Sequence, residues 1–229
     1  MLILCLIMLG LNSTVTWSMV RSLMLSIGNY RANLFRTADY LIQSGHVSTV
    51  HFHGKRFAWF VSDVTRKDWD WIINSCVYGQ LFPSASDAEM ASLRALGERW
   101  KSYELSGQWV YEQHPFWCTG YTFWDLPTEA PDLFQHLSGS DLVIFKGDLN
   151  HRKLAYDCAA PAETPFREAI GPMGFAPGAP RVASLRTIKS DVVVGLAERR
   201  IAEELDAKEA GWRISGKYAV ILLSEGGRR

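Results

Sequence analysis

The chain has 229 residues, of which 24 are basic and 24 acidic, so its formal net charge is zero. This balance argues against a general nucleic-acid binder, because phosphate backbones are held by an excess of lysine and arginine. With 48% hydrophobic and 21% charged residues, the chain is neither disordered nor a polytopic membrane protein. Its length fits one large domain or two small ones, one α/β domain of this size is common, and the apolar fraction suffices for a sizeable core.

An apolar run begins the chain. Residues 1–11 read MLILCLIMLGL, and Arg21 is the only charged residue among the first 30. The run is too short to cross a bilayer, which requires roughly 20 residues, and no lysine or arginine precedes it as in a signal peptide. Asn12-Ser13-Thr14 matches a glycosylation acceptor, which matters only after secretion. We expect a buried or irregular first segment of a cytoplasmic domain that does not bind membranes, with a targeting signal as the alternative.

The four cysteines lie far apart in the sequence, at Cys5, Cys76, Cys118 and Cys158. They include no CxxC pair, so their spacing indicates neither a zinc site nor a disulfide-rich scaffold. We therefore expect a reduced, cytoplasmic protein.

Short apolar runs alternate with longer amphipathic ones from about residue 38 onwards. Residues 47–52 (VSTVHF) and 57–61 (FAWFV) are short and rich in β-branched or aromatic side chains, which predicts two strands. Ser86 begins a predicted helix in which apolar residues recur every three or four positions. Gly107 is expected to end that helix.

The C-terminal half continues the alternation of strands and helices. Residues 142–145 (LVIF), 192–194 (VVV) and 218–223 (YAVILL) are apolar throughout, which predicts buried strands. Residues 171–180 are expected to form a loop, and residues 196–210 a charged helix. This order predicts an α/β fold: a mostly parallel sheet with helices on both faces, in a Rossmann-like three-layer arrangement. Functional residues of such folds gather where the strands end.

Two polar clusters lie beside predicted strands. Residues 146–153 (KGDLNHRK) directly follow a buried strand, and their lysines and arginine beside aspartate and asparagine suit a phosphate near a divalent cation. Residues 185–191 (LRTIKSD) carry two cations and two hydroxyls, which could hold an anion. An ordinary solvated loop and a surface turn are the alternative interpretations.

Two further candidates lie near the predicted aromatic strand. Asp63 follows that strand, where a carboxylate can bind a hard metal ion. It could equally cap the next helix, where Thr65 and Asp68 resemble a capping box. His51 and His53 alternate on one face of their strand and could bind a metal, but we favour structural histidines there.

Five segments occur in a fixed order: HFHGKRFAWFVSDVTRKDW (51–69), HPFWCTGYTFWDLP (114–127), DLVIFKGDLNHRKL (141–154), SLRTIKSDVVVGL (184–196) and GKYAVI (216–221). Together they resemble the damage-control phosphatases, specifically the subfamily III sugar-phosphate phosphatases. The resemblance runs from about residue 37 to residue 223. It implies metal-dependent hydrolysis of small phosphomonoesters, such as fructose 1-phosphate or fructose 6-phosphate, with Mn²⁺, Co²⁺, Ni²⁺ or Mg²⁺ as the cofactor.

The resemblance also assigns roles to residues. Asp63 matches the family's carboxylate metal ligand, and Lys189 matches the lysine that contacts the substrate phosphate, so both are expected to be catalytic. The expected substrate-binding residues are Asp148, Leu149, Asn150, His151, Arg152, Arg186, Thr187 and Lys189. Among them, His151 stands where the family usually has tyrosine. The implied metal would polarise a phosphoryl oxygen and activate water, while the cations offset charge on the other oxygens.

One family feature is missing from the sequence. Members carry an upstream Asp-Asn metal-binding pair, and here only the tail of that segment is recognisable, at Thr37–Leu41 (TADYL). Asp39 falls on the ensuing helix, so we do not expect it to replace the pair. Residues 1–36 are therefore expected to be a divergent apolar segment, and residues 37–225 the α/β phosphatase domain of an N-terminally truncated member that lacks the family's helical N-terminal domain.

Three functional hypotheses follow. The chain is expected to be a metal-dependent phosphatase of sugar phosphates, because the GDLNHR and RTIK segments are intact. The alternative is a truncated, catalytically impaired fragment that binds phosphate ligands, because the Asp-Asn pair is missing. Carboxyl methylation of protein glutamates, an activity attached to some relatives, ranks below both, since no glycine-rich nucleotide loop follows a first strand.

Overall fold

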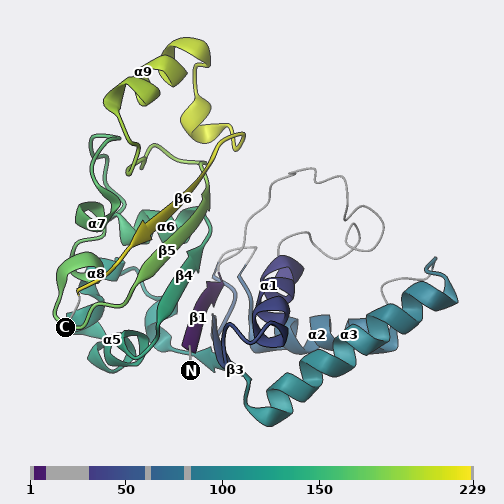
Figure 1. The fold of residues 1–229 in the computed structure, drawn as a ribbon. Helices are drawn as coiled ribbons and strands as arrows, with labels where there is room; N and C mark the ends of the chain where they lie inside the picture. Colours follow the sequence, from purple (N-terminus) through teal and green to yellow (C-terminus); the bar gives the residue numbers. More distant parts are fainter. Residues whose placement is uncertain (1–2, 9–30, 60–62, 80–83, 228–229) are drawn as a thin grey trace.

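The computed structural model describes residues 3–8, 31–59, 63–79 and 84–227 of the chain. Its centre is a six-stranded sheet in the order β3-β2-β1-β4-β5-β6 (Figure 1). Neighbouring strands from β3 to β5 are parallel, and only β6 runs antiparallel to its neighbour β5. The strands are β1 (Ile3–Met8), β2 (Thr49–Gly54), β3 (Trp109–Gln113), β4 (Leu142–Lys146), β5 (Val182–Thr187) and β6 (Ala219–Ser224).

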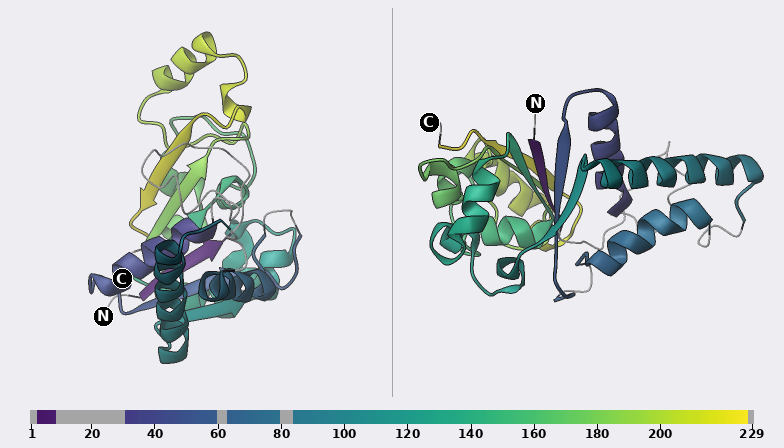
Figure 2. Two further views of the ribbon diagram at one scale, coloured as in Figure 1. Left: turned by 90° about the vertical axis from the view of Figure 1, so that its right-hand side faces the viewer. Right: turned by 90° about the horizontal axis from the view of Figure 1, so that it is seen from below.

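Helices cover both faces of the sheet, which confirms the predicted α/β class (Figures 1 and 2). One face is covered by α1 (Arg31–Gln43), α2 (Arg66–Tyr78) and α3 (Asp87–Ser106). The other face carries the 3₁₀ turns η1 (Pro115–Cys118) and η2 (Phe123–Asp125) and the short helices α4 (Leu126–Glu129), α5 (Pro131–Ser138), α6 (Asp148–Leu154), α7 (Phe166–Ala169) and α8 (Pro172–Phe175). Beyond the sheet, α9 (Arg199–Lys208) and η3 (Trp212–Ile214) form a separate small cluster with Ile188 and Val193.

An aromatic core joins the first helical layer to the sheet. Phe35 of α1 contacts the rings of four other fully buried side chains, with centroid distances from 4.6 to 5.5 Å: Phe52, Trp69, Trp100 and Trp109. Such edge-on and tilted ring pairs contribute about 0.5–1.5 kcal/mol each beyond the area they bury. This core fixes β2 and β3, and the residue that follows β2, Lys55, belongs to the site described below.

The long helix agrees with its prediction because both of its ends carry strong sequence signals. Ser86 caps the N-terminus of α3 in a capping box with Glu89, and Gly107 closes the helix in the left-handed conformation, with φ of 75°. The capping box of α2 is formed by Thr65 and Asp68. Thr65 is therefore the residue that caps α2, and Asp63 is not.

Three predicted strands differ from the structure. Residues 57–59 form a loop, and residues 60–62 lie outside the described part. Residues 192–194 are buried but do not pair with any described strand. The strand in this part of the chain is β5, in which buried positions alternate with half-buried ones and include polar side chains. β6 is an edge strand with Ile221 80% exposed, not a buried one. The predicted loop 171–180 also contains α8.

The apolar start of the chain takes part in the sheet. Residues 3–8 form β1, which pairs with β2 on one side and β4 on the other. The segment expected to be buried or irregular thus forms a central strand over these residues, while Asn12-Ser13-Thr14 lies outside the described residues. The division at residues 36 and 37 stays a prediction. No helix within the described ranges is long and apolar enough to cross a membrane.

A glycine on α3 permits its close contact with α2. A Cβ atom built on Gly97 would lie 2.8 Å from Val77 Cγ2 and 2.9 Å from the Val77 backbone nitrogen. Alanine normally stabilises a helix relative to glycine by about 1 kcal/mol, but here the clash exceeds that gain. We expect Gly97→Ala to lower the free energy of unfolding by about 1–3 kcal/mol in urea titrations. The matched control Gly120→Ala, with no atom within 4 Å, should be neutral; equal effects would contradict the close packing.

Candidate active site

The order of the strands reverses between β1 and β4, which is where open α/β sheets bind ligands, outside the carboxyl ends of the strands. Lys55 directly follows β2, Asp148 lies two residues after β4, and Arg186 lies near the end of β5. Helix α6 follows β4 and carries Asp148 at its start and Lys153 near its end. Two polar groups are assembled at this edge of the sheet.

The first group, here called the lysine–aspartate group, comprises Lys55, Asp63 and Lys153. Lys55 and Asp63 are each 2% exposed, and Lys55 Nζ lies 4.0 Å from Asp63 Oδ2. The same carboxylate oxygen accepts a hydrogen bond of 3.0 Å from the backbone of Trp59, and Lys55 donates to the carbonyl of Trp117. Burial lowers the pKa of Lys55, and the charge of Asp63 opposes that shift.

Lys153 completes this group from α6. Its ammonium donates to the carbonyl of Thr119 at 2.9 Å and lies 5.3 Å from the ring centroid of Phe123. Burial lowers the pKa of Lys153 to about 8, and the neighbouring charge of Lys55 adds to the shift. Two ammonium groups that repel each other inside the protein therefore lie beside one carboxylate. Such a pair is stabilised by a bound anion.

The second group, the arginine–aspartate group, is an internal ion pair. Arg186 Nε donates to Asp148 Oδ1 at 2.8 Å, and the guanidinium also donates to Ser190 and to the carbonyl of Val192. The backbone nitrogen of Lys189 donates to the same Asp148 oxygen at 3.1 Å. The Arg186 side chain is 1% exposed. These contacts fix the loop after β5 on the start of α6.

The other expected substrate-binding residues of α6 are held by protein groups. Asn150 is fully buried and donates to the Lys146 carbonyl at 2.9 Å. His151 is also fully buried, with Nδ1 3.0 Å from Ser184 Oγ. Burial lowers the pKa of His151 to about 3, and the charge of Arg186 adds to the shift, so this imidazole is neutral at physiological pH. Arg152 makes a bidentate ion pair with Asp157, at 2.6 and 2.7 Å.

Three expected site residues lie elsewhere on this edge. Thr187 pairs with Ala219 of β6, and Leu149 is half-buried on α6. The side chain of Lys189 packs beside Gly216. A Cβ atom built on that glycine would lie 3.4 Å from Lys189 Cε. The structure thus gathers Asp148 with Arg186 and the Lys189 backbone, and Asp63 with two lysines. The assigned substrate and catalytic roles stay predictions.

The sequence does not indicate Lys55 as a site residue, nor that Lys153 lies near Lys55 and Asp63. A signal was present in both cases: Lys55 immediately follows β2, and Lys153 ends the polar run after β4. The closeness of these residues depends on α6 reaching across the sheet edge towards Lys55 and Asp63. No local pattern encodes that contact.

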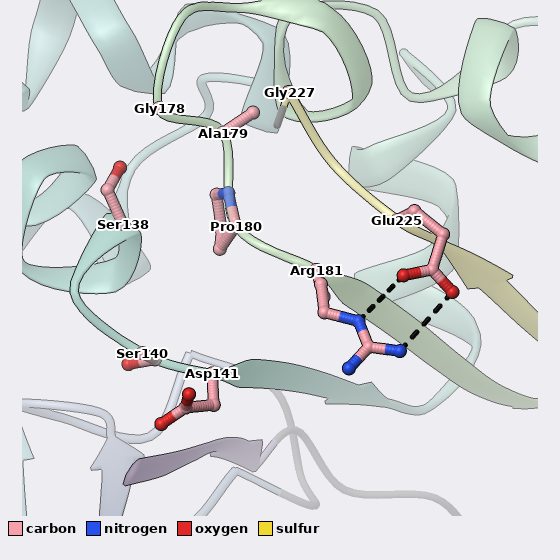
Figure 3. Close-up of a pocket in the computed structure, with 9 residues that line it drawn as sticks. All are labelled: Ser138, Ser140, Asp141, Gly178, Ala179, Pro180, Arg181, Glu225 and Gly227. Carbon is pink, nitrogen blue, oxygen red and sulfur yellow. Dashed lines mark hydrogen bonds and ion pairs between the residues drawn. The ribbon is translucent and has the colours of Figure 1, made fainter. Parts of the chain in front are cut away.

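A surface pocket of about 460 Å³ lies at the opposite end of the sheet, at the amino ends of β4 and β5. Figure 3 shows the ion pair between Arg181 and Glu225 in its wall, with Arg181 Nε 2.8 Å from Glu225 Oε2. The arginine is therefore held by a neighbouring carboxylate. Both the fold rule and the charges place the candidate site at the other end.

Comparisons with known proteins agree with this fold. Residues 34–205 match the model of a protein family described as the damage-control phosphatase ARMT1-like domain. The chain is 41% identical over 187 residues to damage-control phosphatase ARMT1 of Danio rerio, covering 82% of this chain and 39% of that protein. It is 42% identical over 190 residues to the Xenopus laevis protein, with coverages of 83% and 40%. It is 37% identical over 183 residues to the Homo sapiens protein, with coverages of 80% and 38%.

The chain thus spans about two-fifths of the length of these curated relatives. The matched region nevertheless includes β2 to β5 and every residue of the two polar groups. The chain belongs to the damage-control phosphatase family with an ARMT1-like domain.

Proposed function

We propose that this chain acts as a metal-dependent phosphatase on small phosphorylated molecules, with sugar phosphates such as fructose 1-phosphate and fructose 6-phosphate as the substrate class. The observation that carries the proposal is the lysine–aspartate group: two partly desolvated ammonium groups beside a buried carboxylate at the carboxyl edge of the sheet. The family name of the relatives supports the reaction class.

The two lysines suit a phosphate monoester. Such an ester is mostly dianionic at neutral pH, because its second pKa is about 6. Lys55 and Lys153 can donate charge-assisted hydrogen bonds to the non-bridging oxygens, which are worth more in a desolvated site than in water. The same cations offset charge on the phosphoryl oxygens during hydrolysis.

An aromatic wall beside the lysines supports a sugar as the rest of the substrate. The ring of Trp59 is 42% exposed, and its centroid lies 5.5 Å from Lys55 Nζ and 5.9 Å from Lys153 Nζ. A phosphate held by these lysines would bring its organic part against this ring. An exposed indole face offers apolar contact to the C–H groups of a sugar while the hydroxyls stay in water.

A divalent metal supplies Lewis-acid polarisation of a phosphoryl oxygen when bound in such a site. Asp63 has the right chemistry as a ligand for Mg²⁺ or Mn²⁺, which prefer several oxygen ligands. Within the described residues, however, the lysine–aspartate group offers a single carboxylate, and Lys55 already shares it. Asp148 is occupied by Arg186. This donor set falls short of a complete metal site.

The incomplete donor set supports a second candidate function, a phosphate-binding protein with little or no turnover. Binding needs only the two lysines and the aromatic wall, whereas hydrolysis needs a metal that Asp63 alone would hold weakly.

An activity assay separates the two candidates. Hydrolysis of p-nitrophenyl phosphate and fructose 1-phosphate would be measured with Mn²⁺ or Co²⁺, with and without EDTA, beside calorimetric titration of inorganic phosphate. Metal-dependent hydrolysis abolished by EDTA is the result expected for the phosphatase. Phosphate binding without hydrolysis would select the second candidate. Absence of both hydrolysis and phosphate binding would overturn both.

The pKa of Lys153 makes phosphate binding dependent on pH. Burial lowers this pKa to about 8, so the ammonium loses its proton as the pH rises through about 8, while a phosphate monoester, with a second pKa of about 6, stays a dianion above neutral pH. We expect the affinity for fructose 1-phosphate in the presence of EDTA to fall about tenfold between pH 7 and pH 9, measured by calorimetry. The charged and titratable groups facing Lys153 are Lys55, Asp63, Cys118 and Asp125.

The matched control for this prediction is Lys153→Arg. A guanidinium keeps its proton over the whole range, so the variant should show a flatter pH profile above pH 7. A profile identical to that of the wild type would mean that another group, such as Lys55, sets the pH dependence.

A further inference from the structure

Four of the six histidines in the chain gather at one edge of the sheet, around a single glutamate. His51 and His53 lie on β2, Glu112 lies beside them on β3, and His136 approaches from α5. His53 and Glu112 are register partners, so their side chains share one face of the sheet. His51, His53, Glu112 and His136 are here called the histidine–glutamate cluster, and His114 flanks it.

Short distances join the members of this cluster. His51 Nδ1 lies 2.6 Å from Glu112 Oε1, and His136 Nε2 lies 3.0 Å from Glu112 Oε2. One ligand atom from each of these three residues lies within 4.8 Å of the others. Ligand atoms of a tetrahedral zinc site are separated by roughly 3.3 Å, given metal–ligand bonds of about 2.0–2.1 Å. Small side-chain rotations therefore suffice to place all three on one ion.

His53 gives independent support for an ion-binding site at this cluster. Its side chain is 1% exposed, and neither ring nitrogen has a hydrogen-bond partner among the described residues. A buried, unsatisfied imidazole costs free energy and requires an explanation. Its Nε2 lies 3.8 Å from Glu112 Oε2, and its ring meets that of His136 at a centroid distance of 5.6 Å. This buried ring is directed towards the same carboxylate as the other two histidines.

We infer that the histidine–glutamate cluster is a binding site for a divalent transition-metal ion of the zinc class, with His51, Glu112 and His136 as ligands and His53 as the fourth. Imidazole nitrogens favour Zn²⁺, Ni²⁺, Cu²⁺ and Co²⁺ over Mg²⁺ and Ca²⁺, which prefer oxygen. Three imidazoles and one carboxylate match the four-coordinate preference of zinc. His51, Glu112 and His136 are 18%, 28% and 41% exposed, so an ion can enter from solvent.

The position of the site indicates what a bound ion would do. It would join β2, the edge strand β3 and helix α5, three elements that are distant in sequence. A ligand that binds only the folded state stabilises it by mass action. Trp117 contacts both His53 and Lys55, so the ion would also steady the wall of the lysine–aspartate group. The proposed site itself shares no residue with that group.

Calorimetric titration of the full chain with Zn²⁺, after treatment with EDTA and dialysis, tests the site. The variants are His136→Ala and Glu112→Gln, both at partly exposed positions that should fold. The matched controls are His46→Ala, an exposed histidine outside the cluster, and Asp63→Asn, which alters the candidate active site. Co²⁺ spectra add a second readout, because visible bands without thiolate charge transfer indicate histidine ligands rather than cysteine.

We expect the wild type to bind one Zn²⁺ and to melt at a higher temperature with it. Affinity should fall at least about tenfold in His136→Ala and in Glu112→Gln, and should be unchanged in both controls. Failure of the wild type to bind Zn²⁺ would overturn the site. Binding that both cluster variants retain, or that Asp63→Asn abolishes, would overturn it as well, because the ion would then lie elsewhere.

Discussion

Replacing Arg186 by methionine should lower the free energy of unfolding by about 3–5 kcal/mol, the largest effect on stability that we expect from one substitution at the sheet edge. Arg186 and Asp148 have side-chain exposures of 1% and 11% and are joined at 2.8 Å. Removing the guanidinium leaves the Asp148 carboxylate with hydrogen bonds from the Lys189 backbone and Ser190 and with the charge of the more distant Arg152. It also removes the donors that hold the carbonyls of Ser190 and Val192.

The design separates a structural role from substrate binding. The double variant Arg186→Met/Asp148→Asn should lose less than the sum of the single variants in urea denaturation, because neither partner then leaves an unpaired charge. Arg199→Ala, which breaks an exposed ion pair on α9, should change stability by less than about 1 kcal/mol. If Arg186→Met keeps full stability and loses only phosphate affinity, Arg186 serves the substrate directly.

The parts of the fold with strong local signals were predictable. Helix α3 is delimited by a capping serine and a left-handed glycine, and β4 follows from its apolar run. Strand β5 was not recognised, because the buried positions Ser184 and Arg186 are polar and interrupt the apolar pattern. The apolar run at 192–194 is buried without pairing to any described strand. Burial and β structure are therefore separate properties. A run of apolar residues indicates burial more directly than it indicates a strand.

For the candidate site, the sequence indicates which segments take part but not which residues pair with each other. Asp63, Lys153 and Arg186 each lie in a polar run beside a strand, which the rule for parallel sheets directs to one edge. Their pairings depend on crossovers between strands that are distant in sequence. The same holds for the histidine–glutamate cluster, since Glu112 and His136 lie some 60 and 85 residues beyond His51. Two alternating histidines alone favour structural roles, and only the neighbours that the fold brings to them suggest a metal.

Replacing Asp63 by asparagine should reduce metal-dependent phosphatase activity at least about 100-fold, while phosphate binding stays within about tenfold of the wild type. Asparagine keeps the shape of the side chain and an oxygen that can accept from the Trp59 backbone. It removes the negative charge that a hard cation requires. The matched control is Asp70→Asn on α2, a partly exposed carboxylate paired with Arg66, which should leave hydrolysis unchanged.

Measuring phosphate affinity in Asp63→Asn separates a role of Asp63 in hydrolysis from a role in phosphate binding. Loss of the carboxylate removes repulsion towards a phosphate but also removes the charge that favours protonation of Lys55, so the two effects oppose each other. Lys153→Met should instead weaken phosphate binding by about 10–100-fold, because it deletes one charged donor. If Asp63→Asn loses hydrolysis but keeps phosphate binding, and Lys153→Met loses phosphate binding, then Asp63 serves turnover and the lysines bind the anion. Hydrolysis that persists in Asp63→Asn would contradict the proposed role of this carboxylate as the metal ligand.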